Sequence, residues 1–135
     1  MRSNYLVKNG MIPGIVCCNT ASGLLGMSRC SDWKFDFFAN IPEEINSTYI
    51  RYIPLADNEI IQTQKVGNLT VTTPFQTIMD LIRYDGDIEF ICESLEWWKD
   101  NFGGLTDIIT GLKDRGLYNK YIEFYLPYYE DSVYL

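Results

Sequence analysis

The chain has 135 residues, of which 18 are acidic, 11 are basic and none is histidine, and its formal net charge is −7. A chain of this length has room for one domain with a real hydrophobic core, which we expect to span residues 1–135. Its 47% hydrophobic and 21% charged residues exclude wholesale disorder and collagen-like or coiled-coil chains. Without histidine, the chain by itself cannot form a Ser-His-Asp or Cys-His catalytic centre, or a histidine-bearing zinc site.

The charge is unevenly distributed along the chain. Residues 1–34 hold four bases and one acid, whereas residues 35–135 hold seven bases and 17 acids, a net charge of −10. Because duplex binders normally carry a basic stripe that replaces phosphate counterions, we expect no direct binding to duplex DNA. An acidic body suits a basic protein partner, or serves solubility alone.

The cysteine pattern and the absence of long apolar runs bear on the compartment. No apolar run approaches the roughly 18 residues of a membrane-spanning helix, and no charged-then-apolar leader opens the chain. We therefore expect a cytoplasmic protein that does not enter a membrane. Its four cysteines make no CxxC pair, and we expect them to be thiols, mostly buried, in a reducing compartment. They are Cys17, Cys18, Cys30 and Cys92.

The first half of the chain has strand character. Short apolar or alternating runs are separated by proline, glycine and asparagine, which is typical of strands. The predicted strands are 14–18, 35–39, 49–53, 60–66 and 69–72. Gly67-Asn68 between the last two predicts a two-residue hairpin turn. Asn19-Thr20 can cap a short helix that reaches Met27.

The second half of the chain has helical periodicity. Thr73 fits an N-cap, Pro74 the first helical position, and Gln76 the last position of a capping box. Ile78 then belongs to an i, i+3, i+4, i+7 apolar stripe. Similar stripes, separated by acidic or glycine stops, predict three further helices. They cover about 88–101, 105–112 and 117–125, the last of them ending before Pro127.

These elements predict an α/β (α+β) fold. A small mixed β-sheet in the N-terminal half should be packed by helices, with about four helices from residue 74 onward.

Motifs for enzyme chemistry are weak. Asp32-Trp33-Lys34 is the only acid-x-Lys triplet, and no acid precedes it to complete a nuclease-type magnesium site. Neither GxxxxGK[ST] nor GxGxxG occurs, so no phosphate loop is expected. Acid pairs such as Glu43-Glu44 or Asp85 with Asp87 fit glycoside chemistry only by a nonspecific pattern. We therefore predict a protein that is not an enzyme, with no catalytic residues, no cofactor and no metal.

Aromatic residues make up 15% of the chain and suggest a partner surface. Trp97 and Trp98 cannot both face a core, because neighbours on a helix are about 100° apart. Trp97 lies closer to the predicted stripe, so Trp98 is expected to be the more exposed ring. Acids accompany tyrosines in the tail. The partner-binding candidates are Trp98, Tyr128, Tyr129, Glu130, Asp131 and Tyr134. The alternative is that these rings complete a core or cover a sheet edge.

Several segments, taken in order, resemble one known family. Residues 14–27 (GIVCCNTASGLLGM) resemble the strand and the ETALxLHGL segment of AbiEi-like antitoxins, from bacterial type IV toxin–antitoxin, or abortive-infection, systems. Residues 35–39 and 49–53 match the two strands that follow in that family. Residues 71–82 resemble its V-x-x-x-E-R-T-hydrophobic-x-D helix, and residues 87–126 its paired-helix tail.

The resemblance has matching positions and departures. Thr77 and Asp80 stand on the motif positions of the family helix, but Phe75-Gln76 replaces the Glu-Arg before the Thr. Leu25 stands where the family has histidine, and Asn19 where it has glutamate. Only about ten residues precede the matching region, so we expect only the C-terminal domain of the family, without its winged helix-turn-helix. DNA binding and autorepression are not carried over.

The resemblance implies a non-enzymatic, antitoxin-like protein-binding module that opposes a partner protein such as a nucleotidyltransferase toxin. The alternative is a phage or mobile-element inhibitor of a host defence protein, resembling an anti-CRISPR protein, in which acidic groups mimic nucleic acid. Both readings require a protein partner, and the oligomeric state stays open. An adjacent nucleotidyltransferase gene would favour the antitoxin, whereas phage genes would favour the inhibitor.

Overall fold

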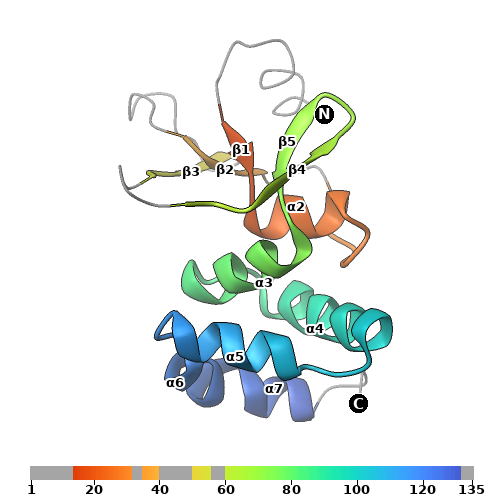
Figure 1. Ribbon diagram of the computed structural model, residues 1–135, viewed down its shortest axis with the longest axis vertical. Helices are drawn as coiled ribbons and strands as arrows, with labels where there is room; N and C mark the ends of the chain where they lie inside the picture. Colours follow the sequence, from red (N-terminus) through yellow and green to blue (C-terminus); the bar gives the residue numbers. More distant parts are fainter. Residues whose placement is uncertain (1–13, 32–34, 40–49, 56–59, 132–135) are drawn as a thin grey trace.

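The computed structural model describes residues 14–31, 35–39, 50–55 and 60–131, and it contains one five-stranded sheet (Figure 1). The strands lie in the order β3-β2-β1-β5-β4. Their bounds are β1 Ile15–Val16, β2 Phe35–Phe38, β3 Ile50–Ile53, β4 Thr63–Val66 and β5 Leu69–Thr72. β1 is parallel to β5 and antiparallel to β2, β2 is parallel to β3, and β4 is antiparallel to β5. The sheet is therefore mixed, as predicted.

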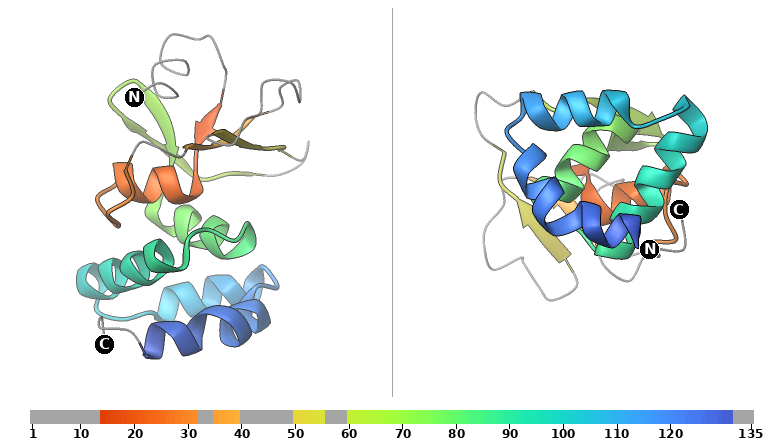
Figure 2. Two further views of the ribbon diagram at one scale, coloured as in Figure 1. Left: turned by 180° about the vertical axis from the view of Figure 1, so that it is seen from behind. Right: turned by 90° about the horizontal axis from the view of Figure 1, so that it is seen from below.

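Helices cover one side of this sheet. They are α2 Cys18–Leu24, α3 Pro74–Arg83, α4 Ile88–Phe102, α5 Thr106–Asp114, and a last helix that comprises α6 Tyr118–Lys120, the π-helical turn η2 Tyr121–Tyr125 and α7 Leu126–Glu130. Both side views show α2 next to the sheet, α3 and α4 below it, and α5 with the last helix at the far end (Figures 1 and 2). The α/β (α+β) class and the four helices after residue 74 are confirmed.

The hairpin and the buried strand follow from local sequence. β4 and β5 are joined by Gly67-Asn68, and Gly67 has a φ of 60°, a conformation that glycine adopts without steric cost.

All four residues of β2 are buried. Phe37 and Phe38 point to opposite faces of the sheet and belong to two separate hydrophobic clusters. β2 therefore lies between two layers of core.

The first helix is capped by a residue distant in sequence. The chain turns from β1 into α2 at Cys18, whose φ is 52°, so the strand ends earlier than predicted and the helix begins earlier. The helix ends at Leu24, before the predicted Met27. Cys17 at the N-cap supplies no side-chain hydrogen bond. Instead, the Asp36 carboxylate accepts a hydrogen bond from the Asn19 N–H at 3.0 Å, and the Asp36 N–H donates to Thr20 Oγ1 at 2.8 Å. A carboxylate at this position satisfies a free N–H group and favours the helix dipole.

The start of α3 confirms the predicted cap. Thr73 Oγ1 accepts a hydrogen bond from the Gln76 N–H, and Pro74 occupies the first helical position. The capping box does not close. The Gln76 amide instead accepts from the Gln62 N–H at 3.3 Å and donates to Asp80 at 3.0 Å, and the Thr73 N–H donates to the Gln62 carbonyl. In a capping box the Gln76 side chain would accept from the Thr73 N–H. Here Gln62, in the segment that leads into β4, bonds to both of these groups instead.

The termini of α4 also follow local signals. Asp87 is its N-cap and accepts a hydrogen bond from the Glu89 N–H at 2.9 Å. Gly103 ends it in the left-handed conformation, with a φ of 76°. Such an ending is typical of a glycine just beyond a helix.

The prediction that the last helix ends before Pro127 is wrong. The helix continues to Glu130, with Pro127 in the first turn of α7. A proline ring clashes with the carbonyl four residues earlier and removes one N–H donor. The π-helical turn η2 lies immediately before α7, where it widens the backbone and relieves this conflict. No helix in the described ranges is long and apolar enough to cross a membrane.

Candidate functional site

The last helix presents aromatic and acidic side chains to solvent. The exposed fraction is 60% for Phe124 and 48% for Tyr128. Phe124, Tyr128 and Asp131 follow spacings of four and three, which place them on one side of a helix. We give the name C-terminal surface to six of the exposed side chains of this helix and its C-cap. It consists of Ile122, Glu123, Phe124, Tyr128, Glu130 and Asp131.

Buried tyrosines hold the opposite side of this helix. Tyr121, Tyr125 and Tyr129 recur every four residues and are 1%, 7% and 3% exposed. The Tyr125 hydroxyl donates to Asp85 at 2.8 Å, and the Tyr129 hydroxyl donates to Glu96 at 3.0 Å. The helix is therefore attached to α4 and to the α3–α4 turn through one face, and the C-terminal surface is the face that remains.

The electrostatics of these contacts keep the phenols neutral. Burial raises the pKa of Tyr121 to about 12. Burial, followed by the hydrogen bond to a carboxylate, raises the pKa of Tyr125 and of Tyr129. The Lys120 ammonium, 2.8 Å from Asp85, lowers the pKa of that carboxyl, and the Tyr125 hydrogen bond lowers it further. At neutral pH the tyrosines are donors and the carboxylates are acceptors.

Two residues that were predicted to be exposed, Trp98 and Tyr129, are buried. Trp98 is 7% exposed, whereas Trp97 is half-buried. Trp98 lies three residues after Leu95 and seven after Ile91, so the heptad spacing of α4 already placed it on the buried stripe. Its ring stacks on Phe102, with centroids 4.1 Å apart, and packs against Phe75.

Tyr129 is likewise buried rather than exposed, because the helix continues past Pro127 and keeps the four-residue repeat of tyrosines. Tyr128, Glu130 and Asp131 are exposed, and Tyr134 lies outside the described residues. The sequence analysis missed Phe124 and Ile122. Their positions beside the tyrosine repeat were the available signal, since a residue next to an inward position turns away by about 100°.

The helical part of the molecule is acidic. Residues 74–131 hold 12 acids and five bases, a net charge of −7. Four of these bases already engage neighbours. Lys120 and Lys99 contact Asp85 and Glu96, while Lys113 and Arg115 lie over the rings of Tyr118 and Phe75. Among the described residues, the carboxylates of the C-terminal surface, Glu123, Glu130 and Asp131, have no ion-pair partner.

A second polar cluster lies under the sheet and serves the fold. Asp36 and Arg51 are directly opposite each other on β2 and β3, and Arg51 Nε donates to Asp36 at 3.1 Å. Arg51 also donates to the Tyr84 carbonyl at 2.7 Å, which attaches the sheet to the end of α3. The neighbouring thiols of Cys17 and Cys18 are 0% exposed, and burial raises the pKa of both. Neutral buried thiols are poor nucleophiles.

The predicted carboxylate pairs have structural partners or lie outside the described residues. Asp87 caps α4, and Asp85 binds Lys120 and Tyr125. Asp32-Trp33-Lys34 and Glu43-Glu44 lie outside the described residues. Within the described ranges, no group of three or more Cys, Asp or Glu side chains is placed to hold a metal ion.

Comparison with protein-family models, with curated proteins and with solved structures found no match to this chain. The resemblance to AbiEi-like antitoxins therefore rests on the sequence segments alone. Those segments form β1 with α2, then β2, β3, and the end of β5 with α3. Thr77 and Asp80, on the matching motif positions, are buried and hydrogen-bonded to Thr72 and Gln76 respectively. In this chain Thr77 attaches α3 to the end of β5, whereas the Asp80 bond lies within α3.

Proposed function

We propose that this protein is a non-enzymatic, antitoxin-like binding module that opposes a partner protein such as a nucleotidyltransferase toxin. The partner binds the C-terminal surface. The observation that carries this proposal is the pairing of two exposed rings, Phe124 and Tyr128, with exposed carboxylates on a helix whose other face is firmly attached. The sequence resemblance to AbiEi-like antitoxins supplies the class of partner.

The energetics of such a surface favour protein binding. Aromatic side chains bury about 150–250 Å² each at an interface and dominate its energy. A ring mounted on a fixed helix loses little conformational entropy when a partner covers it. Exposure of the apolar Phe124 and Tyr128 rings to water is unfavourable. The core does not need these two rings, because three neighbouring tyrosines already complete it.

The charge of the surface specifies the kind of partner. Glu123 and Glu130 are exposed on the same helix as the two rings, and Asp131 lies on the same side as the rings. Carboxylates around an apolar centre steer a basic protein toward the site and disfavour duplex DNA. We therefore expect a partner with a basic face, and a cytoplasmic encounter with it.

The test is neutralisation of a nucleotidyltransferase toxin encoded beside this gene, combined with a binding assay on the purified pair. Phe124→Ser and Tyr128→Ser should each weaken binding at least about tenfold and reduce neutralisation. Neither variant should lower the melting temperature appreciably, because both rings are exposed. Ile60→Ser is the matched control. Ile60 is 90% exposed, but it lies just before β4 and outside the C-terminal surface. Unchanged neutralisation by the Phe124 and Tyr128 variants would contradict the proposal.

A second candidate is favoured by the −7 charge of residues 74–131. An acidic inhibitor from a phage or mobile element can occupy the nucleic-acid channel of a defence effector by presenting carboxylates in place of phosphates. Its binding should weaken steeply with salt and compete with nucleic acid. Binding to a toxin through the two rings should depend on salt much less.

A further inference from the structure

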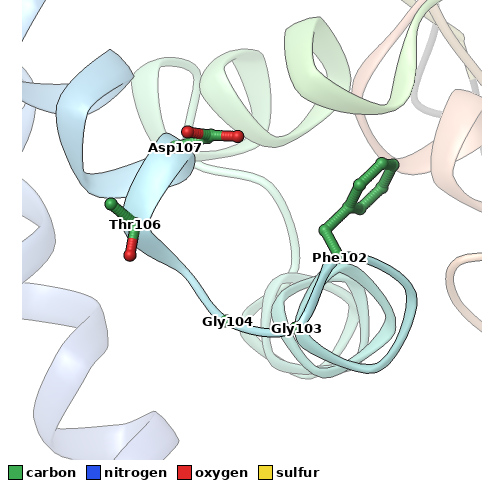
Figure 3. A pocket seen from close by; sticks show the side chains of 5 residues that line it. All are labelled: Phe102, Gly103, Gly104, Thr106 and Asp107. Carbon is green, nitrogen blue, oxygen red and sulfur yellow. The ribbon is translucent and has the colours of Figure 1, made fainter.

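A hollow lies where α4 passes into α5. Its volume is about 220 Å³, and its lining residues are Phe102, Gly103, Gly104, Thr106 and Asp107. Figure 3 shows the Phe102 ring, at the end of α4, on one side and the Asp107 carboxylate, in the first turn of α5, on the other. The backbone of the two glycines runs between them. The hollow is thus of a size that suits one side chain rather than a cofactor.

Two glycines form part of the wall of the hollow. Gly103 and Gly104 have φ values of 76° and 151°, in the region that side-chain-bearing residues rarely adopt. A Cβ atom at either position would meet no other atom within 4 Å. The backbone conformation, rather than a lack of space, is therefore what favours glycine at both positions.

The Phe102 ring is held in place before any ligand arrives. It is 57% exposed, and it stacks on Trp98 with centroids 4.1 Å apart and planes 27° apart. Trp98 itself is buried against Phe75. Trp98 thus supports one face of Phe102, and Trp97 meets the same ring edge-to-face with centroids 6.1 Å apart. Much of the Phe102 ring nevertheless stays open to solvent. A fixed ring face attracts cations through its quadrupole.

The charge at the hollow is negative. Asp107 is exposed, and within the described part of the chain neither its carboxylate nor the Thr106 hydroxyl has a hydrogen-bond or ion-pair partner. The N-terminus of α5 contributes roughly half a positive charge, which is less than the full negative charge of the carboxylate. A cation therefore fits between ring and carboxylate better than an anion.

We propose that this hollow receives the side chain of an arginine from a basic protein partner. A guanidinium is planar, stacks on an aromatic face and donates paired hydrogen bonds to a carboxylate, which is the combination that Phe102 and Asp107 present. The chain uses the same pairing internally, since the Arg115 guanidinium lies 4.9 Å from the ring centroid of Phe75. This site goes beyond the C-terminal surface. It rests on the proposed function in one respect only, namely that the arginine belongs to a protein partner.

The test is a titration of the ¹⁵N-labelled full chain with the peptide acetyl-Gly-Arg-Gly-amide, followed by two-dimensional NMR. Glycine amides resonate apart from most others, so Gly103 and Gly104 serve as reporters. We expect saturable shifts at these glycines and at Asp107, with a Kd on the order of millimolar for so small a ligand. The citrulline peptide, which has the same shape without the charge, should bind at least about threefold more weakly.

Variants separate this site from the proposed function. Asp107→Asn and Phe102→Leu should each raise the Kd of the arginine peptide at least about threefold. Asp114→Asn, an exposed acid at the other end of α5, and Phe124→Ser, on the C-terminal surface, should leave it unchanged. The two proposals can therefore fail separately. A negative toxin assay does not change the expected arginine-peptide binding, and a negative peptide titration does not change the expected toxin neutralisation.

Three outcomes would overturn the site. Equal shifts with the citrulline peptide would show that charge is irrelevant. Larger shifts with inorganic phosphate would indicate an anion site at the start of α5. Shifts confined to other residues, or no saturable shift up to tens of millimolar, would show that the hollow does not take arginine.

Discussion

Replacement of Gly111 by alanine sets two opposing effects against each other. Gly111 lies inside α5, where helix propensity alone predicts that alanine stabilises by about 1 kcal/mol. A Cβ atom at Gly111, however, would lie 2.7 Å from Cε1 of Phe75, closer still to its Cζ, and 3.3 Å from Sδ of Met79. Carbon atoms do not approach this closely, so the Phe75 ring must move.

The Phe75 ring has little room to move. The Trp98 ring packs against it, and the Arg115 guanidinium lies over its face. Met79 is fully buried beside it. Overpacking of this kind costs about 1–3 kcal/mol, which exceeds the gain in propensity. We therefore expect Gly111→Ala to lower the free energy of unfolding by up to about 2 kcal/mol.

Urea denaturation followed by circular dichroism measures this change. Phe75→Leu provides the control, because it removes the ring atoms that the new methyl group meets. In that background, Gly111→Ala should be neutral or stabilising, and the two substitutions should show a coupling energy of about 0.5–3 kcal/mol. A gain in stability of about 1 kcal/mol from Gly111→Ala in the natural chain would refute the close contact on which the argument rests.

Three further predictions concern stability. Thr73→Ala should cost about 1 kcal/mol through loss of the cap on α3, and Ile78→Ala about 2–5 kcal/mol, in the same denaturation assay; equal and negligible losses would contradict the position of α3. Trp98→Ser should lower stability by about 3–5 kcal/mol, since the ring is buried, and an unchanged melting temperature would show that it is not. Burial raises the pKa of Cys92 from 9.0 to about 11 and of Tyr121 from 10.0 to about 12, so the folded state retains protons that the unfolded chain releases. The free energy of unfolding should therefore fall as pH rises above about 9, by up to about 1.4 kcal/mol per pH unit for each such group, and a flat profile to pH 11 would contradict this.

Local signals in the sequence were sufficient wherever the structure depends on neighbours along the chain. Thr73 with Pro74 starts α3, and Gly67-Asn68 turns the hairpin, as predicted. Asp87 and Gly103 mark the two ends of α4. Caps and tight turns involve hydrogen bonds and backbone angles within about four residues, so the sequence states them directly.

The candidate site was less accessible from sequence, because it depends on which face of each helix is covered. The tail was expected to bind a partner through Tyr129 as well as Tyr128, and through Trp98. Pro127 by itself predicts the end of the last helix, but the π-helical turn before it accommodates the proline. Once the helix continues, its four-residue repeat turns Tyr129 inward and leaves Tyr128 and Phe124 outside.

By itself, the sequence determined the element order, the mixed class of the fold, the absence of histidine chemistry and the acidity of residues 74–131. Only the tertiary structure decided that Asp36 caps α2 and binds Arg51, and that a hollow separates Phe102 from Asp107. The reason is physical. Periodicity and capping are properties of adjacent residues, whereas burial and long-range hydrogen bonds arise only when segments distant in sequence pack together.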